Sequence, residues 1–294
     1  MSGTLNSVNT NTGAMIALET LNSTNSQLNA VQKQISTGYR VADATDDGAA
    51  YAVAQGVRSD VNALTTANQQ LGGVQGLLST TSTSLNEIST TLSSMRDVLV
   101  ELSNGNTSGS QRSQYAATYK TLAQQVQGYI QDANYSGKTL IGNISGSNGA
   151  FSGVAVIRNE VGSTYGITTF SGSAVYHGVT ISHLLTSTAL GATKSAASFA
   201  SLITATGGFI KQFNSISTAL NTYGAATNYV TNQITYNSDK INALNSGLGA
   251  LVDADMATES AMLQSLQIRQ QLGTQALTLA DQAPQTLLSL VKNA

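Results

Sequence analysis

Apolar residues recur at alternating steps of four and three along both ends of the chain. This spacing places them on one face of a helix that packs against another helix, and such a set of positions is called a stripe below. The first stripe consists of Ala14, Leu18, Leu21, Asn25, Leu28, Gln32 and Ile35. Gly38 follows it and is expected to end the helix.

A second, longer stripe follows without a break in its spacing. It consists of Val57, Val61, Leu64, Asn68, Leu71, Val74, Leu78, Thr81, Leu85, Ile88, Leu92, Met95, Leu99 and Leu102. A helix of this extent is about 70 Å long. Gly72, Gly73 and Gly76 each weaken its middle by up to about 1 kcal/mol relative to alanine. Because the spacing continues through the glycines, the sequence predicts one continuous helix.

The middle of the chain loses this periodicity. Residues 103–110 are rich in Asn, Gly and Ser, which predicts a turn. A third helix is then predicted from the stripe Tyr115, Tyr119, Leu122, Val126, Tyr129 and Ala133. Three β-like runs bounded by Gly-rich turns follow at 154–157, 165–170 and 174–181. The sequence therefore predicts a small β-rich or mixed region at about 135–205.

Two further stripes occupy the C-terminal part. The first consists of Phe209, Phe213, Ile216, Leu220, Tyr223, Thr227, Val230, Ile234, Asn237, Ile241, Leu244 and Leu248. Around Gly247 and Gly249 the steps become four, four and four, which predicts a joint. The last stripe consists of Val252, Met256, Glu259, Leu263, Leu266, Gln270, Gly273, Leu277 and Ala280, and continues through Leu287 and Val291. Pro284 is expected to kink or restart this helix.

These patterns predict a mainly α fold, a long antiparallel bundle or coiled coil formed by the N- and C-terminal segments. The first helix should pair with the last, and the second with the helix near 209–248. The terminal helices also carry apolar residues off their stripes: Met15, Ile16, Val31, Met262, Leu279, Leu288 and Leu290. Helices with two apolar faces bury the second against neighbouring subunits, at about 25 cal/mol per Å². This favours a self-assembling structural protein over an ordinary intramolecular bundle.

Composition narrows the function further. Charged residues are 10% of the chain and the net charge is −2, against roughly 25% charged residues in an average domain. Clustered Lys and Arg for nucleic acid or anionic lipid are missing from the sequence. It has no Cys, no run of about 18 apolar residues, and no basic residue before Lys33. We therefore expect no disulfide, no membrane insertion and no charged signal peptide.

The sequence predicts no enzyme, metal site or cofactor. His177 and His183 do not have the spacing of an H-E-x-x-H helix. Asp253, Asp255 and Glu259 could suggest a cation site, but carboxylates there also cap and favour the start of a helix, which is the preferred interpretation. Residues 72–76 do not have the pattern of a phosphate-binding loop.

Both ends of the chain resemble bacterial flagellins. The N-terminal stretch is SVNTNTGAMIALETLNSTNSQLNAVQKQISTGYRVADATDDGAAYAVAQGVRSDV, with the turn at 35–38 and the Asp46-Asp47 loop. The C-terminal stretch is LGALVDADMATESAMLQSLQIRQQLGTQALTLADQAPQTLLSLV. Two long matches in order, at opposite ends, are specific. The lack of Cys and Trp, the single Pro and the few charges are also similar to flagellins.

The resemblance implies a subunit that is exported unfolded and polymerises into the extracellular flagellar filament. It implies filament-core helices at 1–42 and 255–294 that are disordered in the monomer, a shell at 43–145 and 205–254, and an outer region at 146–204. Core-helix subunit contacts are expected at Leu18, Leu21, Leu28, Ile35, Leu263, Leu266, Leu277, Leu287 and Leu288. Shell-helix stripe residues are Leu85, Ile88, Leu92, Met95, Leu99, Ile234, Ile241 and Leu244. Implied partners are further copies of the chain, an export chaperone, the distal cap protein and the hook–filament junction protein.

The stretch SSMRDVLVELSNGN at 93–106 resembles the segment that the innate immune receptor for flagellin recognises. Strong agonists begin it with Gln-Arg, where this chain has Ser93 and Ser94. Arg96 is kept, and Asp97 replaces a Glu. Contacts would come from Ser94, Arg96, Asp97 and Val100, and weak receptor activation is expected. These positions are also subunit contacts by resemblance.

Two other functions stay open from the sequence. A hook–filament junction protein shares the terminal helices but should resemble flagellin less closely at the C-terminus than QAPQTLLSLV does. A surface adhesin or glycan-binding protein would remain monomeric. The abundant Ser and Thr of 145–205 are candidate O-glycosylation positions.

Overall fold

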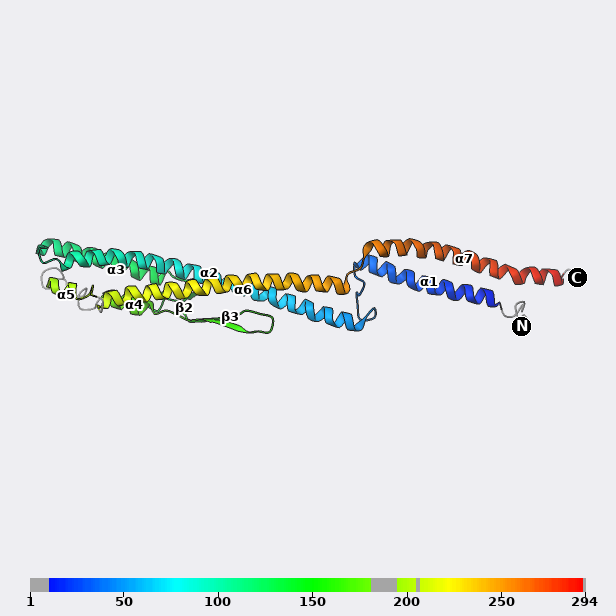
Figure 1. The fold of residues 1–294 in the computed structure, drawn as a ribbon, viewed down its shortest axis with the longest axis horizontal. Coiled ribbons are helices and arrows are strands. Elements are labelled where there is room, and N and C mark those ends of the chain that lie inside the picture. The colour runs from blue at the N-terminus through cyan, green and yellow to red at the C-terminus, as the bar shows by residue number, and fades with distance from the viewer. Residues whose placement is uncertain (1–10, 181–194, 205–206, 293–294) are drawn as a thin grey trace. The chain divides into compact units, whose positions relative to one another are not determined.

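The computed structural model describes residues 11–180, 195–204 and 207–292, and the side chains of the last helix up to Gln282. Its helices are α1 (Thr12–Thr37), α2 (Gly48–Ser103), α3 (Gly109–Gln131), α4 (Gly172–Thr180), α5 (Ala196–Ala200), α6 (Gly208–Val252) and α7 (Met256–Lys292). Its strands are β1 (Lys138–Thr139), β2 (Ala150–Phe151), β3 (Val154–Ile157) and β4 (Thr164–Ile167). The predicted mainly α fold is confirmed (Figure 1).

The chain forms two compact units. The terminal unit comprises Met1–Ser59 and Ala243–Ala294, and the central unit comprises Asp60–Asn242. Both long helices, α2 and α6, have residues in each unit. The continuous α2 confirms that Gly72, Gly73 and Gly76 do not break the helix.

In the terminal unit, α1 and α7 lie side by side and run antiparallel (Figure 1). Asn25 accepts a hydrogen bond from Gln270 at 2.7 Å, and Ala254 N donates to Gly38 O at 3.0 Å. Gly38 ends α1 with φ of 74°, a left-handed conformation that glycine adopts without strain. The predicted pairing of the first and last helices is thus confirmed.

The buried face of α1 differs from the predicted stripe at every second position. Leu28 and its heptad equivalents Ala14, Leu21 and Ile35 turn inward, but Val31 is 4% exposed whereas Leu18 is 48% exposed. The predicted stripe and the observed buried face share every seventh residue and differ by one position in between. Both contain apolar side chains. The observed phase buries Val31 and leaves the amide of Gln32 exposed, which avoids the cost of burying a polar group.

The described part of the terminal unit contains two small clusters of buried apolar side chains. Leu28, Val31 and Leu266 form one small cluster, with Ile35 and Leu263 packed against it. A second cluster joins the connector after α1, the start of α2 and the end of α6. It consists of Val41, Ala54 and Val252, with Ala50, Tyr51, Leu248 and Leu251 around it. Among the described side chains, several large apolar residues of α1 and α7 are therefore left exposed.

The central unit packs α2, α3 and α6 around one extended core. The α2 stripe is buried as predicted from Leu64 through Leu102, except for the half-buried Asn68, and Tyr223 and Val230 meet it from α6. Asn68 donates to Ser238 and Gln75 to Thr231, so the two helices are antiparallel, as predicted.

A β-hairpin of β3 and β4 lies against α6. Its tip is anchored by an ion pair from Lys240 to Glu160 and by the carbonyl of Arg158, which accepts from Asn237 Nδ2 at 3.0 Å. Asn237 is fully buried and also donates to Asn68 of α2 at 2.9 Å. The hairpin therefore satisfies an amide in the interface between the long helices.

Two of the three predicted β-like runs need correction. Residues 154–157 form β3 as predicted, but the second strand is Thr164–Ile167, and Phe170 lies beyond it. The strand expected at 174–181 is wrong, because 174–180 lie in α4 and Ile181 is outside the described residues. Gly172, Val175 and Val179 are buried at steps of three and four, a helical period that the β-branched residues obscured.

The joint before the last helix is also placed differently. The helix α6 runs through Gly247 and Gly249 and ends at Val252, so the joint that was predicted around these glycines follows Val252 instead. Asp255 begins α7 instead, because its carboxylate accepts from the amides of Ala257 and Thr258. The capping role expected for this residue is confirmed. Beyond it, α7 continues through Pro284 to Lys292, so of the two expected effects of Pro284 the restart is wrong and the kink stays a prediction.

Candidate assembly surfaces of the terminal helices

The outward face of α7 carries a second apolar stripe. Ile268 and Leu272 are each 58% exposed and Leu279 is 70% exposed. With Ala261, Ser265 and Gln275 these residues keep the steps of four and three, on the side of α7 away from the buried Leu266. Leu279 was expected from the sequence, whereas Ile268 and Leu272 were not, although the same spacing in a second phase is the signal that could have found them.

The first turns of α1 also expose large apolar side chains. Met15 and Ile16 are more than 60% exposed, and Leu18 lies beside them. A shallow groove follows this face, lined by Thr12, Met15, Ile16, Leu18, Glu19 and Asn22. Exposed apolar residues gathered on one helix face are typical of surfaces that bind another protein.

The predicted core-helix contacts divide into two groups. Leu21, Leu28, Ile35, Leu263, Leu266 and Leu277 are buried or half-buried on the faces of α1 and α7. Leu18 is exposed, and the side chains of Leu287 and Leu288 lie outside those described. The structure therefore brings most of these residues together within one chain, and their role between subunits stays a prediction.

The other predicted site residues lie on the long helices. Leu85, Ile88, Leu92, Met95 and Leu99 are fully buried, whereas Ile234, Ile241 and Leu244 are half-buried. Ser94, Arg96, Asp97 and Val100 all lie on the exposed side of α2. This segment is accessible in the chain, and its recognition by an immune receptor stays a prediction.

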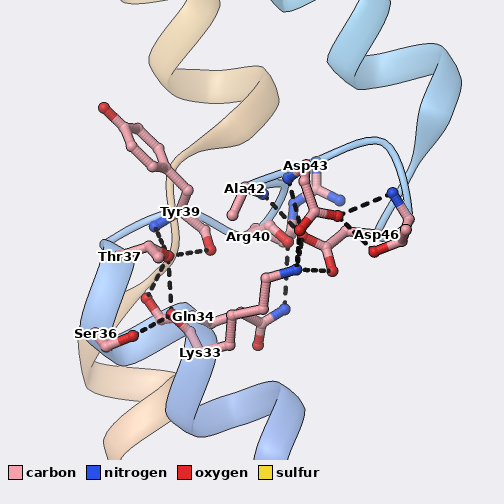
Figure 2. A network of polar contacts seen from close by, with 10 residues as sticks. Lys33, Gln34, Ser36, Thr37, Tyr39, Arg40, Ala42, Asp43 and Asp46 are labelled. Carbon is pink, nitrogen blue, oxygen red and sulfur yellow. Dashed lines mark hydrogen bonds and ion pairs between the residues drawn. The ribbon is translucent and has the colours of Figure 1, made fainter.

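The connector between α1 and α2 is held by one lysine (Figure 2). Lys33 Nζ donates to Asp43 Oδ2 at 2.6 Å and to Asp46 Oδ1 at 2.8 Å. Hydrogen bonds from Lys33 hold the pKa of both carboxyls below their usual range, and those carboxylates raise the pKa of Lys33. Asp46 also accepts from the amide of Ala42 at 2.9 Å. The polar network thus fixes the loop that leads into α2.

This connector lies against the joint between α6 and α7. Arg40 N donates to Val252 O at 2.8 Å, and its guanidinium donates to Leu251 O. Tyr39 forms an isolated bridge with Asp253, and Arg58 lies 5.4 Å from the centre of the Tyr39 ring. The connector between α1 and α2 and the joint between α6 and α7 are therefore held together by backbone and side-chain contacts.

The described residues contain no cluster of three or more His, Asp or Glu side chains arranged to hold a metal ion. His177 is exposed on α4, and His183 lies outside the described residues. Within the parts of the chain that the structure describes, none of the helices combines the length and hydropathy that a bilayer crossing requires.

Comparison with known proteins decides the family. Residues 8–146 match the bacterial flagellin N-terminal helical region, and residues 203–291 match the bacterial flagellin C-terminal helical region. The chain belongs to the bacterial flagellins. This flagellin is a structural subunit of the bacterial flagellar filament, and swimming motility is the function that the family implies.

Similar flagellins match this one from end to end. Flagellin FljO of Caulobacter vibrioides is 31% identical over 98% of this chain and 99% of its own. A flagellin of Brucella melitensis is 30% identical, with 97% and 99% covered. A solved structure described as a putative flagellar hook-associated protein from Vibrio parahaemolyticus is 16% identical, with a TM-score of 0.58, over 71% of this chain and 100% of that one. That likeness concerns the fold alone.

Proposed function

We propose that copies of this flagellin pack into the filament through the outward stripe of α7 and the exposed first turns of α1. The observation that carries the proposal is the exposure of Ile268, Leu272 and Leu279 at helix-packing spacing on α7. The other face of α7 already packs against α1. A second copy fits this stripe, because subunits of a homopolymer offer the same helices to one another.

The small core of the terminal unit supports the same proposal. Leu28, Val31 and Leu266 are the buried side chains of the cluster that joins α1 to α7. A pair of helices with so few buried contacts gains most of its stability from further packing. The proposed division is a filament core at 1–42 and 255–294, a shell at 43–145 and 205–254, and an outer region at 146–204. The two family matches, which end at 146 and resume at 203, are compatible with that outer region.

The subunit would reach the filament by unfolded export, with a chaperone on its C-terminal segment. It would then fold in the extracellular space under the distal cap. The filament would begin at the hook–filament junction protein. The small apolar cluster between α1 and α7 supports a terminal unit that folds only when it reaches its neighbours. We propose no catalytic role. The exposed segment with Ser94, Arg96, Asp97 and Val100 would activate the immune receptor only weakly, and picomolar potency in a receptor reporter assay would contradict this.

The proposed contacts can be tested by substituting Ile268 and Leu272 with Ser. Full burial of each side chain contributes about 1.5–3 kcal/mol, so loss of both should raise the critical concentration for polymerisation more than about a hundredfold. Seeded growth followed by sedimentation and electron microscopy measures this. The monomer should unfold at an unchanged temperature, because neither side chain is buried within the chain.

The matched control exchanges the same residues for apolar isomers, Ile268→Leu with Leu272→Ile, and should polymerise nearly as the parent does. Serine variants that polymerise at the parental concentration would refute the contact. A larger deletion, of residues 255–294, should leave a chain that cannot polymerise and that binds the export chaperone weakly. Normal filaments from that fragment would contradict the role of α7 as a whole.

A further inference from the structure

The helix α7 contains a proline well inside its bounds. It runs from Met256 to Lys292 and passes through Pro284. In an α-helix each amide donates to the carbonyl four residues earlier, but proline has no amide hydrogen. The carbonyl of Ala280 therefore does not receive the regular hydrogen bond of the helix.

The side chain of Asn11 donates to this carbonyl. Asn11 Nδ2 lies 2.8 Å from Ala280 O, although the two residues are 269 positions apart. The other end of the same amide caps α1, because Asn11 Oδ1 accepts from Ala14 N at 3.0 Å. One end must donate and the other must accept, so the two partners fix the orientation of the side chain.

The surroundings bring these groups close. A Cβ placed on Gly13 would lie 4.0 Å from the Cβ of Ala280, so the first turn of α1 approaches α7 directly. Asn11 and Ala280 are both half-buried, which limits the access of water to the carbonyl and raises the cost of leaving it unpaired.

We propose that Asn11 is a positioning residue, which docks the start of α1 onto the carbonyl that Pro284 leaves free and so sets the register of α1 against α7. A capping role alone would not require asparagine, because Ser, Thr and Asp cap helices comparably well. Unlike these three residues, asparagine has an amide hydrogen that can donate to Ala280 O while its side-chain oxygen caps α1. The same contact offsets the proline within α7, which otherwise lacks one hydrogen bond.

A double-mutant cycle separates the docking from the capping. Asn11→Ser keeps a capping oxygen but is too short to reach Ala280 as well, and Pro284→Ala restores the backbone donor to Ala280. N11S should raise the critical concentration for polymerisation roughly tenfold, the size of one lost hydrogen bond. In the P284A background the same change should alter it less than about twofold. Equal effects in both backgrounds would refute the proposal.

A direct measurement covers the case in which a variant does not polymerise. Solid-state NMR of parental filaments should show a through-space correlation between the Asn11 side-chain nitrogen and the Ala280 carbonyl carbon. Filaments in which this correlation is absent would overturn the inference while leaving the proposed assembly intact. Because the readout uses filaments, the inference rests on the proposed assembly of the terminal helices. The raised critical concentration expected for I268S with L272S tests that assembly separately.

Discussion

Replacing Gly172 with alanine should destabilise the central unit. A Cβ on Gly172 would lie 2.1 Å from the backbone oxygen of Ile141 and 2.7 Å from Cγ2 of Ile130. The oxygen belongs to the backbone and cannot rotate away, so the first turn of α4 must move. Such overpacking costs about 1–3 kcal/mol, which lowers the melting temperature of a unit of this size by ~2–12 °C. Thermal unfolding of the monomer, followed by circular dichroism, measures the shift.

The matched control is the same substitution at Gly224. A Cβ there would meet nothing within 4 Å, and the residue lies inside α6. Alanine is favoured over glycine in a helix interior by up to about 1 kcal/mol, so G224A should unfold at the parental temperature or above it. The two alanines should thus shift the melting temperature in opposite directions. If G172A is as stable as the parent, the close approach of α4 to Ile141 is refuted.

Three further predictions concern polar groups. Tyr119→Phe should lower the stability of the central unit by about 1–3 kcal/mol in chemical denaturation, because the buried phenol donates to Val179 O at 2.7 Å; an unchanged midpoint would contradict this bond. Asn237→Leu should cost a similar amount and loosen the hairpin, detected as faster hydrogen exchange at β3 and β4, and unchanged exchange would refute the anchoring. Because Lys33 lowers the pKa of Asp46 from 3.8, the connector contact should be present above that pH and be lost as the pH falls through the lowered value. An NMR titration should find this pKa raised again in K33M, and an unchanged pKa would show that Lys33 is not the cause.

Helix positions were predictable wherever one phase of the apolar spacing dominates. In α2, buried leucines recur from Leu64 to Leu102 on one face, and the other faces are mostly polar, so the face and the continuity of the helix followed from the sequence. Helix α1 has apolar residues in two phases along its length. The sequence alone could not decide between Leu18 and Val31, because that choice depends on the partner helix.

Features that depend on distant contacts were not predictable. The segment of α4 contains β-branched Val175, Val179 and Thr180, which favour a strand locally, but it forms a helix that buries Gly172, Val175 and Val179. The joint at Asp255 depends on a single carboxylate that caps α7. In the sequence, the glycines at 247 and 249 are a stronger signal for a joint than one aspartate is. At Pro284 the sequence does not reveal that Asn11, from the other end of the chain, donates to the carbonyl of Ala280.

A reconstruction of the native filament by electron cryomicroscopy, at a resolution that places side chains, tests the account most directly. The outward stripe of α7 should then lie against a neighbouring subunit, with Ile268, Leu272 and Leu279 within about 4.5 Å of its apolar side chains. If these three side chains instead face solvent while the subunits meet elsewhere, the proposal that this stripe assembles the filament is contradicted.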